Sequence, residues 1–430
     1  MRPNGLAVQG GHLWMGGCDT VNLAAEYGTP LYVMDEDQIR ESCRQYIASM
    51  AQAYRGNGMV VYASKALSCK EIYRIVLHEG LEVEVVSGGE LYTARAAGVP
   101  GEKIHFQGNN KTPEELTMAV KEGVGDIVVD NREELYRLQE ISCAQAVVSR
   151  ISIRVKPGID PHTHEAVRTG QIDSKFGVSI ETGEALALVA EARSMTNLSL
   201  QGLHCHIGSQ IFETAPFVAA AEVMLRFYAE IRDRLGLIFP RLNLGGGFGV
   251  AYTQEDPAVP YGDYVTAAAE KVHALCEALE LPCPQIVIEP GRSIVAEAGI
   301  TLYTVGSLKE IPGVRNYAAV DGGMFENPRY ALYQAEHDCM LANRAEEPAD
   351  YLVTVAGKCC ESGDLIGQHR KMPKPRPGDL MAVLGTGAYH YSMSSNYNRN
   401  LRPPLVMVSK GKSRLAVKGE TYEDLIRNDI

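Results

Sequence analysis

Hydrophobic positions in the first two thirds of the chain alternate between two periods. Short runs of consecutive apolar residues, such as VVYASKAL at 60–67, are typical of buried strands, and longer stretches between them repeat every three or four residues, as amphipathic helices do. The strand-like runs lie at 60–67, 81–87, 103–108, 126–130, 148–155, 198–208, 241–249 and 285–293. Eight strands, each followed by helical sequence over roughly 250 residues, predict a (β/α)8 barrel. A doubly wound open sheet is the alternative, but it rarely repeats so regularly.

The helical stretches carry recognisable ends. Asp35 stands near the start of the helix predicted at 35–54, Gly80 closes the next helix, and Thr112 and Glu115 have the spacing of a capping box. The predicted helices cover 35–54, 69–80, 88–99, 112–124, 131–144, 181–195, 215–236 and 261–281.

The pattern changes after about residue 299. Strand-like runs broken by Gly and Pro, with little helix between them, predict an all-β second domain; they lie at 300–311, 316–324, 351–360, 379–387 and 404–413. The first segment, 1–34, is also strand-like and rich in turns, and we expect it to pair with this β domain. The expected division is therefore 1–34, a barrel at 35–298 and a β domain at 299–430, packed closely because no low-complexity linker separates them.

Composition narrows the function classes. The 430 residues carry a net charge of −12, which argues against nucleic acid or an anionic membrane as a partner. No apolar run is long enough to span a membrane, and the first residues do not resemble a signal peptide. The ten cysteines form no CxxC, so we expect most of them to be small core residues in a reducing compartment, the cytoplasm.

Residues that carry chemistry gather at the C-terminal ends of the predicted strands, where barrels of this kind place their sites. Lys65 ends the first strand and Glu289 the eighth. The others are Glu84 and Ser87 on the second strand, Arg154 near the end of the fifth, His206, Gly208 and Ser209 at the sixth, Gly245, Gly246, Gly247 and Gly249 at the seventh, and Gly291 and Arg292 after the eighth.

Each of these signals also has an ordinary structural explanation. Lys65 by itself could extend its ammonium from a strand end to solvent. The GGGFG segment at 245–249 could be only a tight turn, or it could bring backbone N–H groups to a phosphate. His204 and His206 could form a metal pair, but no third and fourth ligands are evident, so we expect no metal.

Taken together, the residues indicate one ligand, a phosphorylated aromatic aldehyde held by a lysine, namely pyridoxal 5′-phosphate (PLP). Lys65 would form the imine. Glu289 would pair with the pyridine nitrogen, so that the ring accepts electrons, and His206 would cover one ring face. The glycine turn, Ser209 and the loop at 290–292 would hold the phosphate.

Eight motifs, in order and spacing, resemble the barrel-fold PLP-dependent decarboxylases related to alanine racemase, and among them most closely the diaminopimelate decarboxylases. They are YASKAL, DSKFG, HCHIGSQ, NLGGGFG, EPGRS, NPRYALY, GKCCESGD and GAYHYSMSSNYN, within a resemblance that covers about residues 25–410. The resemblance implies a PLP-binding barrel with a C-terminal β domain, in a homodimer whose active sites lie between subunits.

The resemblance also implies roles for individual positions. Lys65 and Cys360 match the catalytic residues, the imine lysine and a proton donor that reaches into the neighbouring subunit together with Glu361. Positions that match cofactor contacts are His206, Ser209, Gly247, Glu289, Pro290, Gly291, Arg292 and Tyr389, and those that match substrate contacts are Arg292, Arg329, Tyr333, Glu361 and Tyr389.

The expected reaction is the decarboxylation of meso-2,6-diaminopimelate to L-lysine and CO2, the last step of lysine biosynthesis by that route. The substrate carries a second carboxylate and ammonium at its far end; Arg292 and Arg329 are suited to carboxylates, and Glu361 to the ammonium. Ornithine and arginine lack the distal carboxylate. A racemase, a polyamine-type decarboxylase and a non-catalytic regulator on the same barrel are the alternatives.

Two positions depart from the family pattern. Glu84 stands where we expect the family to have Asp, which leaves its contact near the imine open. The segment PHTHEAVRTG differs from the HPYISTG form of many members, so His162 and His164 have no assigned role and are interpreted as loop histidines.

Overall fold

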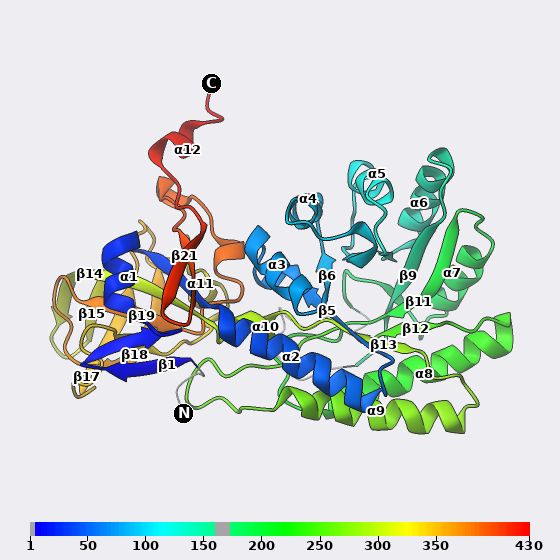
Figure 1. The fold of residues 1–430 in the computed structure, drawn as a ribbon, viewed down its shortest axis with the longest axis horizontal. Helices are drawn as coiled ribbons and strands as arrows, with labels where there is room; N and C mark the ends of the chain where they lie inside the picture. The colour runs from blue at the N-terminus through cyan, green and yellow to red at the C-terminus, as the bar shows by residue number, and fades with distance from the viewer. Residues whose placement is uncertain (1–4, 160–172) are drawn as a thin grey trace.

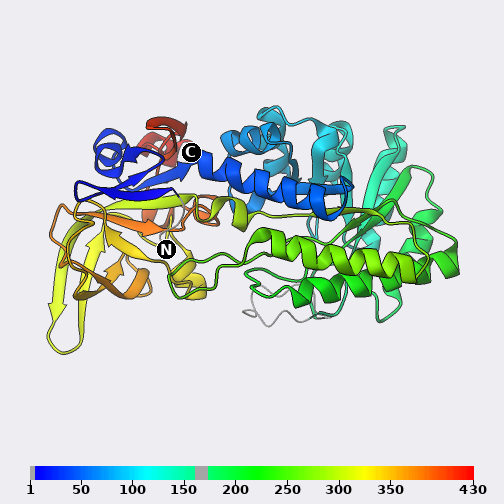
Figure 2. The same cartoon turned by 60° about the horizontal axis from the view of Figure 1, so that its bottom comes forward.

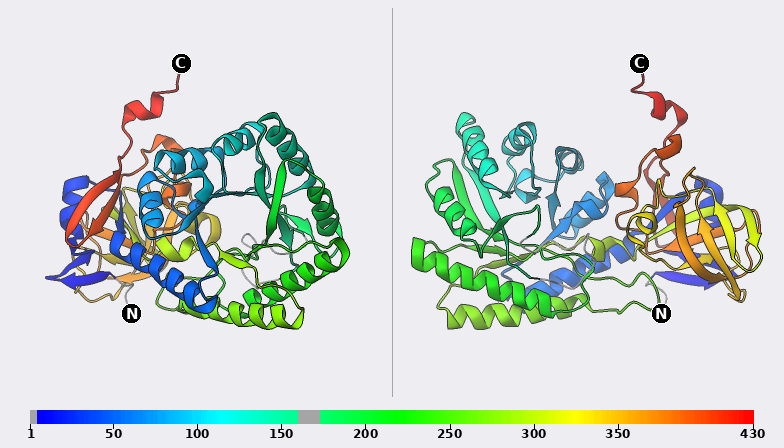
Figure 3. Two further views of the ribbon diagram at one scale, coloured as in Figure 1. Left: turned by 45° about the vertical axis from the view of Figure 1, so that its right-hand side comes forward. Right: turned by 180° about the vertical axis from the view of Figure 1, so that it is seen from behind.

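The computed structural model describes residues 5–159 and 173–430, which form a barrel and a β-rich domain side by side (Figure 1). Eight parallel strands make the barrel, and pairing of the last with the first closes the ring, which Figure 3 shows end on. The predicted barrel is therefore confirmed. Its strands are β5 (Gly58–Ala63), β6 (Glu82–Val85), β7 (Ile104–Phe106), β8 (Asp126–Val129), β9 (Ser149–Lys156), β11 (Leu198–His204), β12 (Arg241–Asn243) and β13 (Gln285–Ile288), with β10 (Val178–Ser179) beside β9.

Helices follow the strands as the periodicity predicts. Asp35 caps the first of them by accepting a hydrogen bond from the Gln38 N–H, and Thr112 with Glu115 forms the predicted capping box. The helices are α2 (Glu36–Ala53), α3 (Lys70–His78), α4 (Gly88–Ala96), α5 (Pro113–Lys121), α6 (Arg132–Ala144), α7 (Glu184–Arg193), α8 (Ala215–Leu235), α9 (Tyr261–Ala278) and the short α10 (Arg292–Val295).

The second domain is a mixed sheet in the order β18-β17-β15-β14-β4-β20-β21, with β19 pairing with β14 and β16. A long β14–β15 hairpin extends from it (Figure 2). Its strands are β4 (Leu31–Asp35), β14 (Gly299–Ile311), β15 (Arg315–Val320), β16 (Cys339–Leu341), β17 (Tyr351–Ala356), β18 (Leu365–Met372), β19 (Leu380–Leu384), β20 (Leu405–Ser409) and β21 (Lys412–Val417). The short helices α11 (Arg329–Tyr333) and α12 (Tyr422–Ile426) interrupt what the sequence predicted as all β.

The N-terminal residues join this domain. A separate antiparallel sheet contains β1 (Leu6–Gln9), β2 (His12–Met15) and β3 (Cys18–Asp19), and α1 (Thr20–Tyr27) leads into β4. Strand β4 lies between β14 and β20. Its side chains point alternately to two different hydrophobic cores. Tyr32 and Met34 pack with barrel side chains, whereas Leu31 and Val33 pack with the β domain. The two domains are therefore fastened together by one shared strand.

The cysteines lie mostly in the interior. Seven of the ten cysteines are buried, and all ten are free thiols. Within residues 5–159 and 173–430, no helix is both long enough and apolar enough to cross a membrane.

The interior of the barrel near the N-terminal ends of its strands is polar. The His105 imidazole lies 2.7 Å from Glu82 Oε2 and 3.8 Å from Asp126 Oδ2, and it is 1% exposed. Ser152 donates a hydrogen bond to Asp126, and Arg241 lies 3.7 Å from the same carboxylate. Burial alone would lower the pKa of His105, but Asp126 and Glu82 together raise it to about 9.

This arrangement predicts a loss of stability in alkali. Because the folded-state pKa of about 9 exceeds the usual 6.5, the stabilisation from protonated His105 is complete below pH 6.5 and disappears as the pH rises through 9. It corresponds to about 3 kcal/mol at most. Unfolding by urea between pH 6 and 10 should show wild-type stability falling relative to His105→Gln, which keeps a polar side chain without the charge. Parallel pH profiles for the two proteins would contradict the prediction.

Candidate active site

A second polar cluster lies two residues further along the strands, at the C-terminal end of the barrel, and it centres on Glu289. One oxygen of Glu289, Oε1, accepts hydrogen bonds from Gln107 Nε2 at 2.5 Å and from Asn243 Nδ2 at 2.7 Å. The other, Oε2, lies 3.1 Å from His204 Nε2. Glu289 is 5% exposed, so three strands hold a buried carboxylate in a fixed orientation.

Lys65 does not end strand β5, as the sequence suggested, but lies in the 3-10 turn Ser64–Ala66 that follows it. This turn redirects the side chain across the end of the barrel, where Nζ lies 3.1 and 3.3 Å from the two oxygens of Glu84. Glu84 is fully buried, and Tyr389 N–H donates to Ala66 O at 2.8 Å. The β domain therefore contacts the same turn that carries Lys65.

The two buried carboxylates near Lys65 differ in their affinity for protons. Burial raises the pKa of Glu84, and the nearby Glu289 raises it further, although Lys65 opposes the shift. Burial also tends to raise the pKa of Glu289. The contacts with His204, Lys65 and Gln107 outweigh burial and hold this pKa well below its usual range. Burial alone would lower the pKa of Lys65. It is raised instead by the neighbouring groups Glu84, Tyr389 and Glu289. Of the two carboxylates, Glu289 is thus the one whose ionised form its neighbours favour.

The glycine turn after β12 passes very close to neighbouring backbone. A Cβ at Gly246 or Gly247 would overlap the carbonyl oxygen of Glu289 or Gly208, and Gly247 has a φ of +115°. Gly246 N–H donates to His206 Nδ1 at 3.3 Å, which orients the imidazole. Burial, reinforced by Lys65 and Arg154, lowers the pKa of His206 well below its usual value, so the ring is neutral.

Arg292 is buried among hydroxyl and aromatic groups. Its NH2 donates to Ser209 Oγ at 2.9 Å and its NH1 donates to Tyr252 OH at 2.5 Å. The guanidinium carbon lies 4.6 Å from the centre of the Tyr389 ring, close enough for a cation–π interaction. Tyr389 itself has a φ of +62°, a backbone conformation that non-glycine residues adopt rarely and mostly at functional positions.

Arg329 approaches the same tyrosine from α11. Its guanidinium carbon lies 5.3 Å from the Tyr389 ring and 5.1 Å from the Tyr333 ring, and Arg329 is only 8% exposed. Burial lowers its pKa, and Arg292 adds to this effect. Among the residues that the structure describes, no carboxylate forms an ion pair with either arginine. Two buried cations therefore lie beside the Tyr389 ring, and neither is paired with a carboxylate of the described residues.

The cleft at the seam of the two domains brings together most of the residues that the sequence singled out. Its lining includes Lys65, His206, Ser209, Gly247, Glu289, Gly291, Arg292 and Tyr389. Pro290 lies in the same loop, and its carbonyl accepts a hydrogen bond from Ala63 N–H on β5. Cys360 and Glu361 do not line this cleft; they are exposed on the loop between β17 and β18.

The histidines of the HCH segment do not act as a pair. His204 ends β11 and contacts Glu289, whereas His206 lies beyond the strand and contacts the glycine turn. In the described part of the chain no group of three His, Cys, Asp or Glu residues is arranged to hold a metal ion. His162 and His164 lie outside the described residues.

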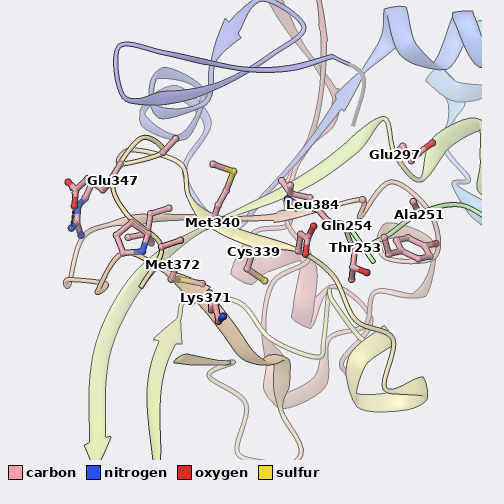
Figure 4. A pocket seen from close by; sticks show the side chains of 18 of the residues that line it. Ala251, Thr253, Gln254, Glu297, Cys339, Met340, Glu347, Lys371, Met372 and Leu384 are labelled. Carbon is pink, nitrogen blue, oxygen red and sulfur yellow. Dashed lines mark hydrogen bonds and ion pairs between the residues drawn. The ribbon is translucent and has the colours of Figure 1, made fainter. Parts of the chain in front are cut away.

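A wider cavity of about 420 Å3 has Tyr252, the residue that binds Arg292, in its lining; Figure 4 shows it from close by. Residues of the 251–258 segment, Glu297 and strands β16 and β18 line it, and the figure shows Glu297 and Lys371 at opposite sides of it. Its lining contains neither Lys65 nor the glycine turn, so its greater size does not make it the candidate active site.

Comparison with known proteins agrees with this geometry. Residues 36–296 match the family model described as "Pyridoxal-dependent decarboxylase, pyridoxal binding domain". The diaminopimelate decarboxylase of Bacillus subtilis (strain 168) is 48% identical over 425 residues, which cover 98% of this chain and 96% of the relative.

The chain belongs to the diaminopimelate decarboxylase family. Crystal structures of this family are similar throughout: the enzyme from M. jannaschii superposes with a TM-score of 0.93 at 34% identity, covering 100% of this chain and 98% of that one. Its complex with L-lysine gives 0.92 at 34% identity, covering 100% and 99%.

PLP is the cofactor of this diaminopimelate decarboxylase family member, and the cleft fits it. The Lys65 amine, the Glu289 carboxylate and the neutral His206 imidazole line one cleft. At Gly247 a side chain would overlap the carbonyl oxygen of Gly208, so the backbone of this turn is bare where it lines the cleft. These groups suit the parts of PLP in turn: Lys65 its aldehyde, Glu289 its protonated ring nitrogen, His206 its ring face and the glycine turn its phosphate.

Proposed function

We propose that this chain catalyses the PLP-dependent decarboxylation of meso-2,6-diaminopimelate to L-lysine and CO2, as a carboxy-lyase of lysine biosynthesis. The observation that carries the substrate assignment is the pair of buried guanidinium groups, Arg292 and Arg329, which have no carboxylate partner among residues 5–159 and 173–430. A buried unpaired cation is unfavourable, and a ligand carboxylate would remove that penalty. The site therefore selects a substrate with a carboxylate to place there.

In this mechanism the residues of the barrel hold the cofactor. Bound PLP supplies an electron sink for the bond that breaks when CO2 leaves. Lys65 Nζ would be the group that holds the cofactor's aldehyde, and Glu84, 3.1 Å from this amine, would orient it. Glu289 would pair with the protonated ring nitrogen, because His204 and the amides of Gln107 and Asn243 favour its ionised form.

Other residues bind the substrate and return a proton. Arg292 and Arg329 bind carboxylate, with the Tyr389 ring beside both guanidinium groups and the Tyr333 ring beside that of Arg329. Cys360 of the second subunit delivers a proton from Sγ to the substrate α-carbon, and Glu361 of the second subunit accepts the distal ammonium. These two roles require a shared site, because neither residue lines the cleft of its own chain.

We therefore also propose a homodimer. Cys360→Ala should lower kcat about 100-fold, the usual contribution of one positioned proton donor, and leave cofactor absorbance intact. Mixing Lys65→Ala and Cys360→Ala subunits should then restore about a quarter of wild-type activity, because half of the dimers are hybrids with one intact site. No recovery in demonstrated hybrid dimers would refute the shared site.

The substrate is tested directly. PLP-loaded protein is given meso-diaminopimelate, L-ornithine, L-arginine and L-lysine in parallel, and CO2 and the amine product are measured. L-Lysine formed from diaminopimelate, with little turnover of the others, is the expected result. Turnover of ornithine or arginine instead would refute the substrate assignment and leave the cofactor assignment intact, because those amino acids offer no distal carboxylate to Arg329.

An ionised Glu289 would favour a cofactor ring that withdraws electrons strongly, which supports decarboxylation over racemisation. The ten unpaired thiols support a cytoplasmic location.

A further inference from the structure

The loop that carries Cys360 and Glu361 is held by a segment more than thirty residues away in the sequence. Cys360 N–H donates to Asn398 Oδ1 at 2.7 Å, and Tyr397 OH donates to Glu361 Oε2 at 3.2 Å. Asn400 Nδ2 also approaches Cys359 Sγ at 3.8 Å. Adjacent residues of one segment thus bind adjacent residues of the loop.

The base of the loop is fixed on its other side by Asp364. Its carboxylate accepts hydrogen bonds from Cys359 N–H at 2.7 Å and from Met324 N–H at 2.6 Å. Beyond this anchor, Cys360 and Glu361 are exposed. Within the described structure, the Cys360 N–H is held by Asn398 and the Glu361 carboxylate by Tyr397.

The holding segment is itself anchored by side-chain contacts. Asn398 has φ +52° and ψ +26°, the left-handed conformation that asparagine tolerates better than most residues. Next to it, Arg399 donates to Leu425 O at 2.7 Å and pairs with Asp429 at 2.8 Å, which ties the segment to the C-terminal helix α12 that extends from the body of the protein (Figure 1). Asn396 donates to Glu420 Oε2 at 2.5 Å.

We propose that Tyr397 and Asn398 are positioning residues for the neighbouring subunit's active site: Asn398 sets the position of the Cys360 thiol, and Tyr397 sets that of the Glu361 carboxylate. This inference rests on the proposed shared site. The two residues touch neither substrate nor cofactor, and they act through the loop that they hold.

The two contacts predict different kinetic effects. Cys360 donates the proton, so loss of the Asn398 acceptor lowers kcat, about tenfold for one hydrogen bond. Glu361 binds the distal ammonium, so Tyr397→Phe raises KM several-fold, and by more than it lowers kcat. A general loss of structure would move both constants and the cofactor absorbance together, which separates the proposal from a purely structural role.

A pair of variants at residue 398 isolates the hydrogen bond from the backbone. Asn398→Gly keeps the left-handed conformation but removes the acceptor, whereas Asn398→Asp keeps both. We expect Asn398→Gly to lose about tenfold in kcat with normal cofactor absorbance and dimer mass, and Asn398→Asp to recover most of that loss. Wild-type kcat in Asn398→Gly, or no recovery in Asn398→Asp, would overturn the proposal.

Mixing subunits tests which site the segment serves. Asn398→Gly mixed with Lys65→Ala should give activity well above the average of the two parents, because one hybrid site combines an intact Lys65 with an intact loop. Asn398→Gly mixed with Cys360→Ala should give no gain, since both changes damage the same loop. The reverse pattern would overturn the proposal.

The parent mixture separates two kinds of failure. If Lys65→Ala and Cys360→Ala do not complement each other, the shared site is wrong. If they do, but Asn398→Gly does not show the same complementation pattern as Cys360→Ala, only this inference is wrong.

Discussion

Replacing Lys65 by alanine is expected to lower kcat/KM for meso-diaminopimelate by on the order of 10⁴-fold, the scale on which enzymes lose activity when a covalently acting residue is removed. The amine is the group in the cleft that can hold an aldehyde covalently and then be displaced by a substrate amine. Absorbance of the purified protein should lose the band of the lysine-bound cofactor at the same time.

Lys65→Arg is the matched control. It keeps a cation beside the fully buried Glu84 and so preserves the ion pair, but a guanidinium does not form the covalent link. Both variants should therefore be inactive, while Lys65→Arg unfolds closer to the wild-type temperature than Lys65→Ala. Appreciable turnover by either variant, measured as CO2 release, would exclude Lys65 from the covalent role.

Arg329→Met is expected to lower kcat/KM for meso-diaminopimelate about a thousandfold, equivalent to about 4 kcal/mol, without destabilising the fold. Methionine fills much of the same volume and removes a buried guanidinium that has no carboxylate partner in the described structure, so the melting temperature should stay the same or rise. Turnover of diamino acids without a distal carboxylate should fall much less, so the ratio between the two substrates is the decisive measurement.

Arg370 supplies the control for this prediction. It is also largely buried, but its NH2 lies 2.7 Å from Glu336, so Arg370→Met should lower stability and leave the substrate ratio unchanged. An Arg329→Met protein with a lower melting temperature and an unchanged substrate ratio would show that Arg329 is a structural residue and not a carboxylate ligand.

The regular parts of the fold were predictable because their pattern is long. Helices such as α8 and α9 repeat an apolar face over five turns, and capping residues such as Thr112 mark the ends. The strands β16 and β18 and the helix α11 were missed. Each is short or carries charged side chains, and tertiary pairing, not local periodicity, holds it in place.

The site was only partly predictable for a related reason. Lys65, Glu289 and the glycine turn stand out because they are unusual at strand ends, but the contacts of Glu289 with Gln107, Asn243 and His204 join strands distant in sequence. One signal could have found these partners. Polar residues two apart, such as those at 241 and 243, occupy the same inward face of a strand, and a polar interior layer follows from that alternation.

The position of β4 also governs how the chain can fold during synthesis. This strand leaves the ribosome early, yet its partners β14 and β20 begin only at Gly299 and Leu405. At about 5–20 residues per second the wait is tens of seconds, during which an apolar strand has no partner. The barrel at the centre of the chain can form in that interval. The β domain, which needs strands from both ends of the chain, then forms last. A circular permutant that begins at residue 36 and carries residues 5–35 after residue 430 should therefore aggregate less during expression than the natural order, because β4 is then made together with its partners.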